Sequence, residues 1–162
     1  MHPRLVRLAG IASLFMLGFM LGATTALAQE AESSTPSGLG LGLKAGAGND
    51  PAQVVLGVQW GLHFRRIRLL RIVPNVHFGF GDETTTDFNA DVLLRLPTGR
   101  GFAIYGGGTP TVTVASGGES DMGGTWVIGT QLPLMTNRAT TLEVRFGSGG
   151  APKFRLMATL IF

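Results

Sequence analysis

The sequence predicts an all-β fold, an eight-stranded antiparallel up-and-down transmembrane β-barrel that follows a cleaved signal peptide. From Gly38 onward, apolar residues recur at every second position, and clusters of turn-forming residues interrupt this alternation. Each alternating stretch has one apolar face and one polar, glycine-rich face, and no helix of useful length can be drawn. The chain also opens on the pattern of a secretion signal.

The first 28 residues have the three parts of a secretory signal peptide. Residues 1–7 are short and basic, residues 8–21 are almost wholly apolar, and Ala26-Leu27-Ala28 has the small residues of a cleavage site. We therefore expect residues 1–28 to be removed and the mature chain to begin at Gln29. The alternative is an uncleaved membrane anchor, because residues 5–28 are long enough to span a bilayer as a helix.

The composition of the chain excludes several classes of site and partner. Cysteine is absent, which excludes disulfides, thiolate metal sites and a lipid-modified cysteine. Two of the 13 cationic residues lie in the signal peptide, so the mature chain would have eleven cationic and ten acidic residues. This near-neutral balance gives no support for a nucleic-acid partner. Residues 29–37 are expected to be a flexible polar segment, and residues 38–162 one barrel domain.

The first four strands show the clearest alternation. In the second, the apolar side chains from Val54 to Phe64 share one face, while glycine and polar residues dominate the other. Pro74 lies in the third strand, where it would remove a backbone donor, so we expect a β-bulge there. The expected strands are Gly38–Ala47, Gln53–Phe64, Leu69–Gly81 and Asp87–Leu96.

The last four strands are less uniform. The face assignment of the fifth and sixth stays open, because Gly106, Gly107, Gly108 and Pro110 in the fifth interrupt the alternation. The eighth is regular again, and its apolar face ends on the C-terminal residue, Phe162. The expected strands are approximately Phe102–Thr113, Gly123–Leu132, Ala139–Gly147 and Lys153–Phe162.

The apolar faces favour a membrane barrel over a soluble one. A soluble barrel of the lipocalin kind would place its apolar face inside, and its exterior would need more charge than the 14% of charged residues present here. Phenylalanines near strand ends predict the aromatic girdles of bilayer interfaces. With a periplasmic N-terminus, Phe64, Phe102 and Phe162 would lie at the inner rim and Phe78, Phe80, Phe88, Trp126, Phe146 and Phe154 toward the outer rim, with Trp60 as a further interfacial aromatic.

The final strand with its terminal aromatic, the "NVHFGFGDE" strand and the "YGGG" of Tyr105–Gly108 resemble small outer-membrane β-barrel proteins of the OmpA-transmembrane and OmpX kind. The resemblance implies residence in the outer membrane, with outer-membrane lipids as partners. It also implies that Phe162 is the signal read by the outer-membrane assembly machinery. We expect a monomer with a structural or surface-interaction role.

The inward faces would carry a polar network. We expect Asp91 to lie opposite His77, and Glu143 diagonal to Arg155. The network predicts either a packed polar plug or, because cations outnumber carboxylates, a narrow anion-favouring pore. The expected network residues are Lys44, Arg71, His77, Asp91, Arg95, Glu143, Arg145, Lys153 and Arg155.

No catalytic, cofactor or metal site is expected. No serine lies beside a histidine, and His63 and His77 fall at opposite ends of their hairpin. The turns at the inner end are basic and the loops at the outer end are acidic. This difference indicates either ordinary solvation of the turns, or a function in which the basic turns bind phospholipid headgroups and the acidic loops bind divalent cations. The inner turns hold Arg65, Arg66, Arg68, Arg100 and Arg138, and the outer loops hold Asp50, Asp82, Glu83, Asp87, Glu119 and Asp121.

Overall fold

The structure is a computed structural model that describes residues 40–64, 67–99, 102–135 and 138–162. The expected signal peptide (1–28) and flexible segment (29–37) lie outside the described residues. Among the described residues, no helix is long and apolar enough to cross a membrane. The strands are β1 (Gly42–Asn49), β2 (Gln53–Gln59), β3 (Leu62–His63), β4 (Leu70–Gly81), β5 (Thr85–Gly99), β6 (Phe102–Ala115), β7 (Ser120–Met135), β8 (Arg138–Gly149) and β9 (Phe154–Ile161).

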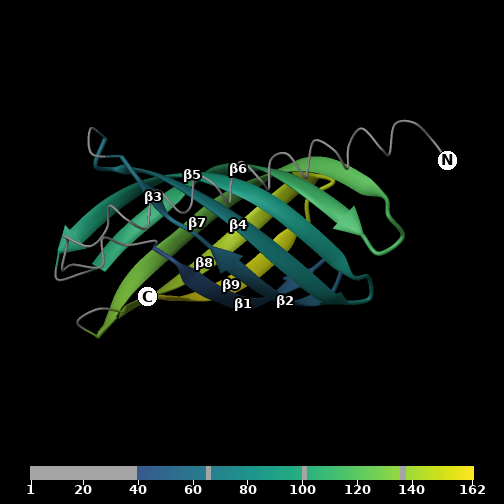
Figure 1. The fold of residues 1–162 in the computed structure, drawn as a ribbon, viewed down its shortest axis with the longest axis horizontal. Helices are drawn as coiled ribbons and strands as arrows, with labels where there is room; N and C mark the ends of the chain where they lie inside the picture. The colour runs from purple at the N-terminus through teal and green to yellow at the C-terminus, as the bar shows by residue number, and fades with distance from the viewer. Residues whose placement is uncertain (1–39, 65–66, 100–101, 136–137) are drawn as a thin grey trace. The chain divides into compact units, whose positions relative to one another are not determined.

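The strands form one closed antiparallel β-barrel. Each strand pairs with the next along the chain, and the pairing of β1 with β9 joins the first strand to the last (Figure 1). β2 and β3 both pair with β4 in one continuous register, so together they form a single strand of the wall. The described residues therefore confirm an eight-stranded, all-β, up-and-down barrel.

The barrel has two distinct ends. We call one the C-terminal rim, because β9 ends there beside the connections β3–β4, β5–β6 and β7–β8. The other is the four-turn rim, where short turns join β1 to β2, β4 to β5, β6 to β7 and β8 to β9. Each of the eight strands of the wall, with β2 and β3 counted as one, runs from one rim to the other, and the strands are visibly inclined in Figure 1.

The prolines interrupt the wall differently from the expectation. The expected bulge at Pro74 was wrong, because the register of β4 with β5 runs through Pro74 without a shift, and β2 and β3 pair with β4 on either side of it at the same offset. The ladder instead breaks between β2 and β3, where the Trp60 N–H still donates to the Pro74 carbonyl at 2.9 Å. The register shifts lie at Pro97 and Pro133, close to the C-terminal rim, where fewer neighbouring rungs constrain the strand.

Pro110 interrupts the β5–β6 ladder, and a side chain bridges the gap. Pro110 has no N–H to donate. The Thr109 hydroxyl accepts a hydrogen bond from the Ala90 N–H at 3.0 Å and donates one to the Pro110 carbonyl at 3.0 Å. The hydroxyl thus takes the place of a direct backbone rung, which lets a proline stand in a strand without an edge.

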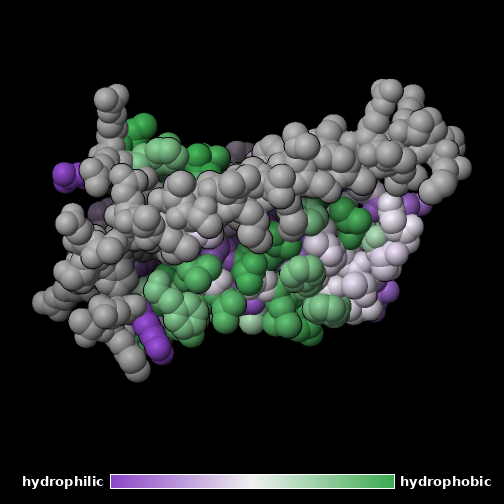
Figure 2. All heavy atoms as spheres, viewed as in Figure 1, coloured by the Kyte–Doolittle hydropathy of each residue, from purple (hydrophilic) through white to green (hydrophobic). Residues whose placement is uncertain are grey.

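The faces of the barrel wall are the reverse of those in a soluble barrel. Large apolar side chains point outward with exposures of 40–68%, whereas the alternate, inward positions are buried and mostly polar. Figure 2 shows apolar side chains in a band across the strands, with hydrophilic ones toward both ends. The alternation continues through β6 and β7, whose faces the sequence left open: Tyr105 and Thr125 point inward and Ile104 and Trp126 outward.

Candidate functional site in the barrel interior

Strand parity positions the interior charges. Successive side chains point to opposite faces, so odd-numbered residues of β4, β5, β8 and β9, and even-numbered residues of β1, face the lumen. Eight of the nine expected residues face inward. Arg95 is half-buried, and the seven others are at most 7% exposed: Lys44, Arg71, His77, Asp91, Glu143, Arg145 and Arg155.

Lys153 is the exception, and its expected interior position was wrong. Its side chain is 74% exposed and forms an ion pair with Asp50 at the four-turn rim. β9 begins only at Phe154, so Lys153 belongs to the preceding turn, where strand alternation no longer fixes the side-chain direction.

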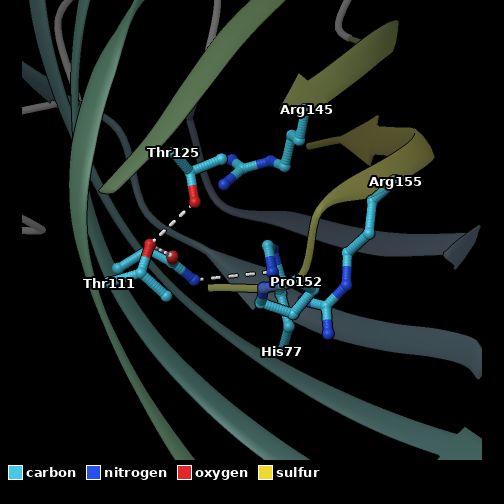
Figure 3. A pocket seen from close by; sticks show the side chains of 7 residues that line it. His77, Thr111, Thr125, Arg145, Pro152 and Arg155 are labelled. Atoms are coloured by element: carbon cyan, nitrogen blue, oxygen red, sulfur yellow. Dashed lines mark hydrogen bonds between the residues drawn. The ribbon is translucent and has the colours of Figure 1, made fainter. Parts of the chain in front are cut away.

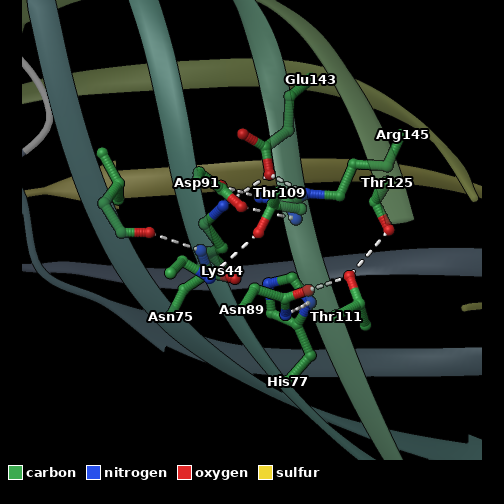
Figure 4. Close-up of polar contacts among 12 residues, drawn as sticks. Lys44, Asn75, His77, Asn89, Asp91, Thr109, Thr111, Thr125, Glu143 and Arg145 are labelled. Atoms are coloured by element: carbon green, nitrogen blue, oxygen red, sulfur yellow. Dashed lines mark hydrogen bonds and ion pairs between the residues drawn. The ribbon is translucent and has the colours of Figure 1, made fainter. Parts of the chain in front are cut away.

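Glu143 is the centre of what we call the central network, formed by Lys44, Asp91, Tyr105, Glu143 and Arg145. Figure 4 shows Lys44, Asp91, Glu143 and Arg145. One oxygen of Glu143, Oε1, lies 2.5 Å from Lys44 Nζ and 2.9 Å from Arg145 Nε. The other, Oε2, accepts a hydrogen bond of 3.1 Å from the Tyr105 hydroxyl. Arg145 also binds both carboxylate oxygens of Asp91. These bonds connect β1, β5, β6 and β8 across the lumen.

A second cluster, the rim network, lies nearer the four-turn rim. Arg155 forms an ion pair with Asp87 and donates a 3.0 Å hydrogen bond to Gln53 Oε1. Thr113 donates to the other oxygen of Asp87 at 2.9 Å, and Gln53 Nε2 donates to Thr85 Oγ1 at 3.1 Å. Every one of these five side chains is at most 9% exposed.

The rim network corrects three sequence expectations. Asp87, expected in an outer loop, is fully buried, because β5 already begins at Thr85 and parity turns Asp87 inward. His77 is paired in register with Asp87 and not with Asp91, which lies opposite Val73. Arg155 is diagonal to Glu143 as expected, but its carboxylate partner is Asp87.

A chain of neutral hydrogen bonds, the hydroxyl relay, lies beside both networks. Thr125 Oγ1 and Thr111 Oγ1 are 2.9 Å apart, and Thr111 Oγ1 donates to Asn89 Oδ1 at 2.8 Å. Asn89 Nδ2 lies 3.4 Å from His77 Nδ1. The His77 ring fits closely against β2, since a Cβ at Gly57 would lie 2.7 Å from its Cδ2 atom.

A group of apolar side chains, which we call the apolar layer, lies in the interior beside the central network, where Val73 is the register partner of Asp91 and Val127 that of Arg145. Its members are at most 2% exposed: Val73, Leu93, Tyr105, Val127, Ala139 and Ile161. Arg71 and Arg95 are the register partners of Leu93 and Tyr105 in this layer, and neither is paired with a described carboxylate. Arg95 Nε donates to Gln131 Oε1 at 3.0 Å, and Arg71 donates to the backbone carbonyls of Arg68 and Leu70. The layer therefore adjoins both these two cations and the charged residues of the central network.

The outward aromatics fall mainly near strand ends. Phe64 follows β3, Phe102 begins β6 and Phe162 follows β9, all at the C-terminal rim. Arg138 places its guanidinium carbon 5.7 Å from the centre of the Phe162 ring. Nearer the four-turn rim, Trp126, Phe146 and Phe154 are register partners on three adjacent strands.

The remaining expected aromatics occupy further outward positions. Phe78 and Phe80 close β4, and Phe88 lies near the start of β5. Trp60 lies between β2 and β3 and is half-buried. The ring of Phe146 meets that of Phe154 edge to face, with 5.7 Å between the centroids.

The two rims differ in charge among the described residues. At the C-terminal rim Arg68 and Arg138 are exposed, while Arg65, Arg66 and Arg100 lie outside the described residues. At the four-turn rim the exposed acids are Asp50, Asp82, Glu83, Glu119 and Asp121, with Lys153 as the exposed cation. No group of three or more histidine, cysteine, aspartate or glutamate side chains in the described part of the chain is placed to hold a metal ion.

Several interior residues were not identified from the sequence. Tyr105 was quoted only as part of "YGGG", although its odd position in β6 puts it inward like Ala103. A Cβ at Gly129 would lie 2.5 Å from the Tyr105 hydroxyl, so this glycine opposite Tyr105 makes room for the ring. Inward parity would also have found Gln53, Thr85, Asn89, Thr111, Thr113, Thr125 and Gln131.

Comparison with known proteins identifies no relative, because no protein-family model, curated protein sequence or solved structure matches the chain.

Proposed function

We propose that this chain is an outer-membrane β-barrel protein with a structural or surface-interaction role and a side-chain-filled interior. The observation that carries the proposal is the reversed distribution of polarity in a closed barrel: apolar side chains outside, paired charges inside. A bilayer solvates such an exterior, and a closed barrel leaves no unpaired strand edge in lipid.

The exposed apolar side chains form a continuous surface. Leu56 pairs in register with Phe78, and Ile128 pairs with Val144, which in turn pairs with the exposed Leu156. A soluble monomer seldom exposes contiguous apolar surface beyond a few hundred Å². Lipid chains as partners account for this surface without requiring a second protein.

The interior supports a structural role over transport. Glu143 and Arg145 are each 2% exposed, and their hydrogen bonds to Lys44 and Asp91 connect strands that are not neighbours in the wall. An eight-stranded barrel is just wide enough for side chains to fill it. The networks brace the wall from within and leave the rims as the surfaces that meet other molecules.

The sequence pattern and this surface together support a place in the outer membrane. A barrel that crosses by strands after a secretion signal belongs in an outer membrane, with a periplasmic C-terminal rim. The exposed Arg68 and Arg138 at that rim are suited to phospholipid phosphates. The resemblance to OmpA-transmembrane and OmpX proteins supports recognition of Phe162 by the outer-membrane assembly machinery.

A gel assay on fractionated cells tests the proposal. The protein should sediment with outer membranes, resist extraction by salt, and change its migration in SDS gels only after boiling, because a folded barrel resists SDS at room temperature. Recovery in the soluble periplasmic fraction, with migration that boiling does not alter, would refute the membrane assignment.

A narrow anion-favouring pore is the second candidate. Arg71 and Arg95, which no described carboxylate neutralises, would attract anions at the C-terminal rim, but the apolar layer beside them opposes ion passage. We expect planar bilayers containing the protein to stay silent. Discrete, anion-selective openings that Arg95→Ala abolishes would show that the protein is a pore and that its interior is not blocked by side chains.

A further inference from the structure

A small pocket lies inside the barrel toward the four-turn rim. Its lining includes His77, Arg145 and Arg155 together with the relay residues Asn89, Thr111 and Thr125, and Pro152 contributes from the β8–β9 turn (Figure 3). The space suits about one water-sized particle. None of the three carboxylates of the two networks lines it.

The hydroxyl relay fixes the hydrogen positions around His77. Asn89 Oδ1 accepts from Thr111, so Asn89 presents its Nδ2–H group to His77 Nδ1. A ring nitrogen that accepts a hydrogen bond carries no proton, so the proton of the neutral imidazole is on Nε2. Nε2 of this fully buried ring has no hydrogen-bond partner among the described residues.

A second unpartnered donor belongs to another residue of the lining. The two terminal nitrogens of the Arg155 guanidinium donate hydrogen bonds to Asp87 and Gln53, whereas its Nε has no partner in the described part of the chain. Arg145, with its carboxylate partners outside the lining, brings a further cation to the pocket. Buried N–H groups without an acceptor are costly, so the pocket requires an occupant that accepts hydrogen bonds.

We propose that this pocket binds one small monovalent anion of the halide class, held by the Nε2–H of His77 and the Nε–H of Arg155 beside the Arg145 guanidinium. A halide accepts hydrogen bonds from several directions and donates none, which matches a lining whose unpartnered groups are donors. Its charge is favoured by the two guanidinium groups that line the pocket.

The balance of charges indicates that binding of the anion is coupled to the uptake of one proton. The charged groups around His77 are Lys44 from β1, Asp87 from β5, Arg145 from β8 and Arg155 from β9, while Gly57 of β2 contributes no side chain. Across the two networks, three cations meet three carboxylates: Lys44, Arg145 and Arg155 against Asp87, Asp91 and Glu143. A bound anion leaves one negative charge in excess, and a proton taken up by His77 removes it.

The hydroxyl relay accommodates this proton. Rotation of the Asn89 amide would turn Oδ1 toward a protonated His77 Nδ1 and Nδ2 toward Thr111, whose hydroxyl would then donate to Thr125. The relay reverses its direction without losing a hydrogen bond, and Nε2–H still donates to the anion. Anion affinity should therefore rise as the pH falls from about 8 to 5, by up to tenfold per pH unit.

The test uses the folded protein in detergent at constant ionic strength. Bromide or chloride, but not an equal concentration of bulky gluconate, should raise the thermal midpoint and shift the His77 imidazole ¹⁵N resonances, with saturation at lower concentration at pH 5.5 than at pH 7.5. His77→Phe should abolish the bromide-dependent rise. Thr141→Val, which removes a buried hydroxyl that does not line the pocket, should retain it.

Crystals soaked in bromide give a second measurement that needs no variant. An anomalous peak within hydrogen-bond distance of His77 Nε2 and Arg155 Nε would support the site. Equal thermal midpoints in bromide and gluconate, with no such peak, would mean a bound water only and would overturn the proposal. Bromide binding that does not change between pH 5.5 and 7.5 would overturn the proton uptake.

Discussion

Replacing Glu143 with glutamine keeps the shape of the central network but removes its most highly connected charge. Arg145 retains Asp91 as its carboxylate partner, whereas Lys44, with a side chain 1% exposed, keeps none among the described residues. Breaking a buried ion pair by neutralising one member costs about 3 to 5 kcal/mol, because the remaining charge stays desolvated. We therefore expect Glu143→Gln to lower the free energy of unfolding by about that amount.

Urea unfolding of the protein in lipid vesicles, followed by tryptophan fluorescence, measures this change. Glu119→Gln is the matched control, because Glu119 is an exposed turn residue whose change should stay within about 0.5 kcal/mol. The double variant Lys44→Met/Glu143→Gln should recover most of the loss, since it removes the stranded cation as well. Equal losses in Glu143→Gln and Glu119→Gln would refute the view that a dry ion-pair network braces the barrel.

Three further changes test the wall, the interior packing and the terminus. Leu142→Arg, at an outward position 47% exposed, should cost about 2 to 4 kcal/mol in a bilayer; a cost near zero in vesicle-unfolding measurements would contradict the lipid contact. Gly57→Ala should destabilise the barrel by about 1 to 3 kcal/mol through contact with the His77 ring, whereas Gly117→Ala, with open space around it, should leave the thermal midpoint unchanged. Phe162→Lys should lower the amount in the outer membrane and leave a protease-sensitive periplasmic form; normal amounts on immunoblots would argue against the assembly role.

Alternation predicted the wall of this barrel well, because in a strand the side-chain direction follows from position alone. It failed at the ends of strands, where a shift of two residues decides whether Asp87 belongs to a turn or to the lumen, and where Lys153 stands one residue outside β9. It could not predict the ion pairs that span the lumen, because their partners lie on strands that are not neighbours in the wall. Asp91 of β5 meets Arg145 of β8 with β6 and β7 between them in the wall. Such contacts depend on curvature and side-chain reach, which register arithmetic between adjacent strands does not include.

The two mid-wall prolines have a mechanical consequence. Pro74 and Pro110 flank Ala90 on the two neighbouring strands, and each withholds one donor from the same circumferential row. A closed barrel resists widening through the rows of hydrogen bonds that run around its wall. The row that lacks two donors is therefore the one that opens most easily. Deuterium should therefore reach the amides of Trp60 and Ala90 before those of the intact rows on either side. Pro74 and Pro110, whose side chains face outward, thus determine which row of the wall opens first.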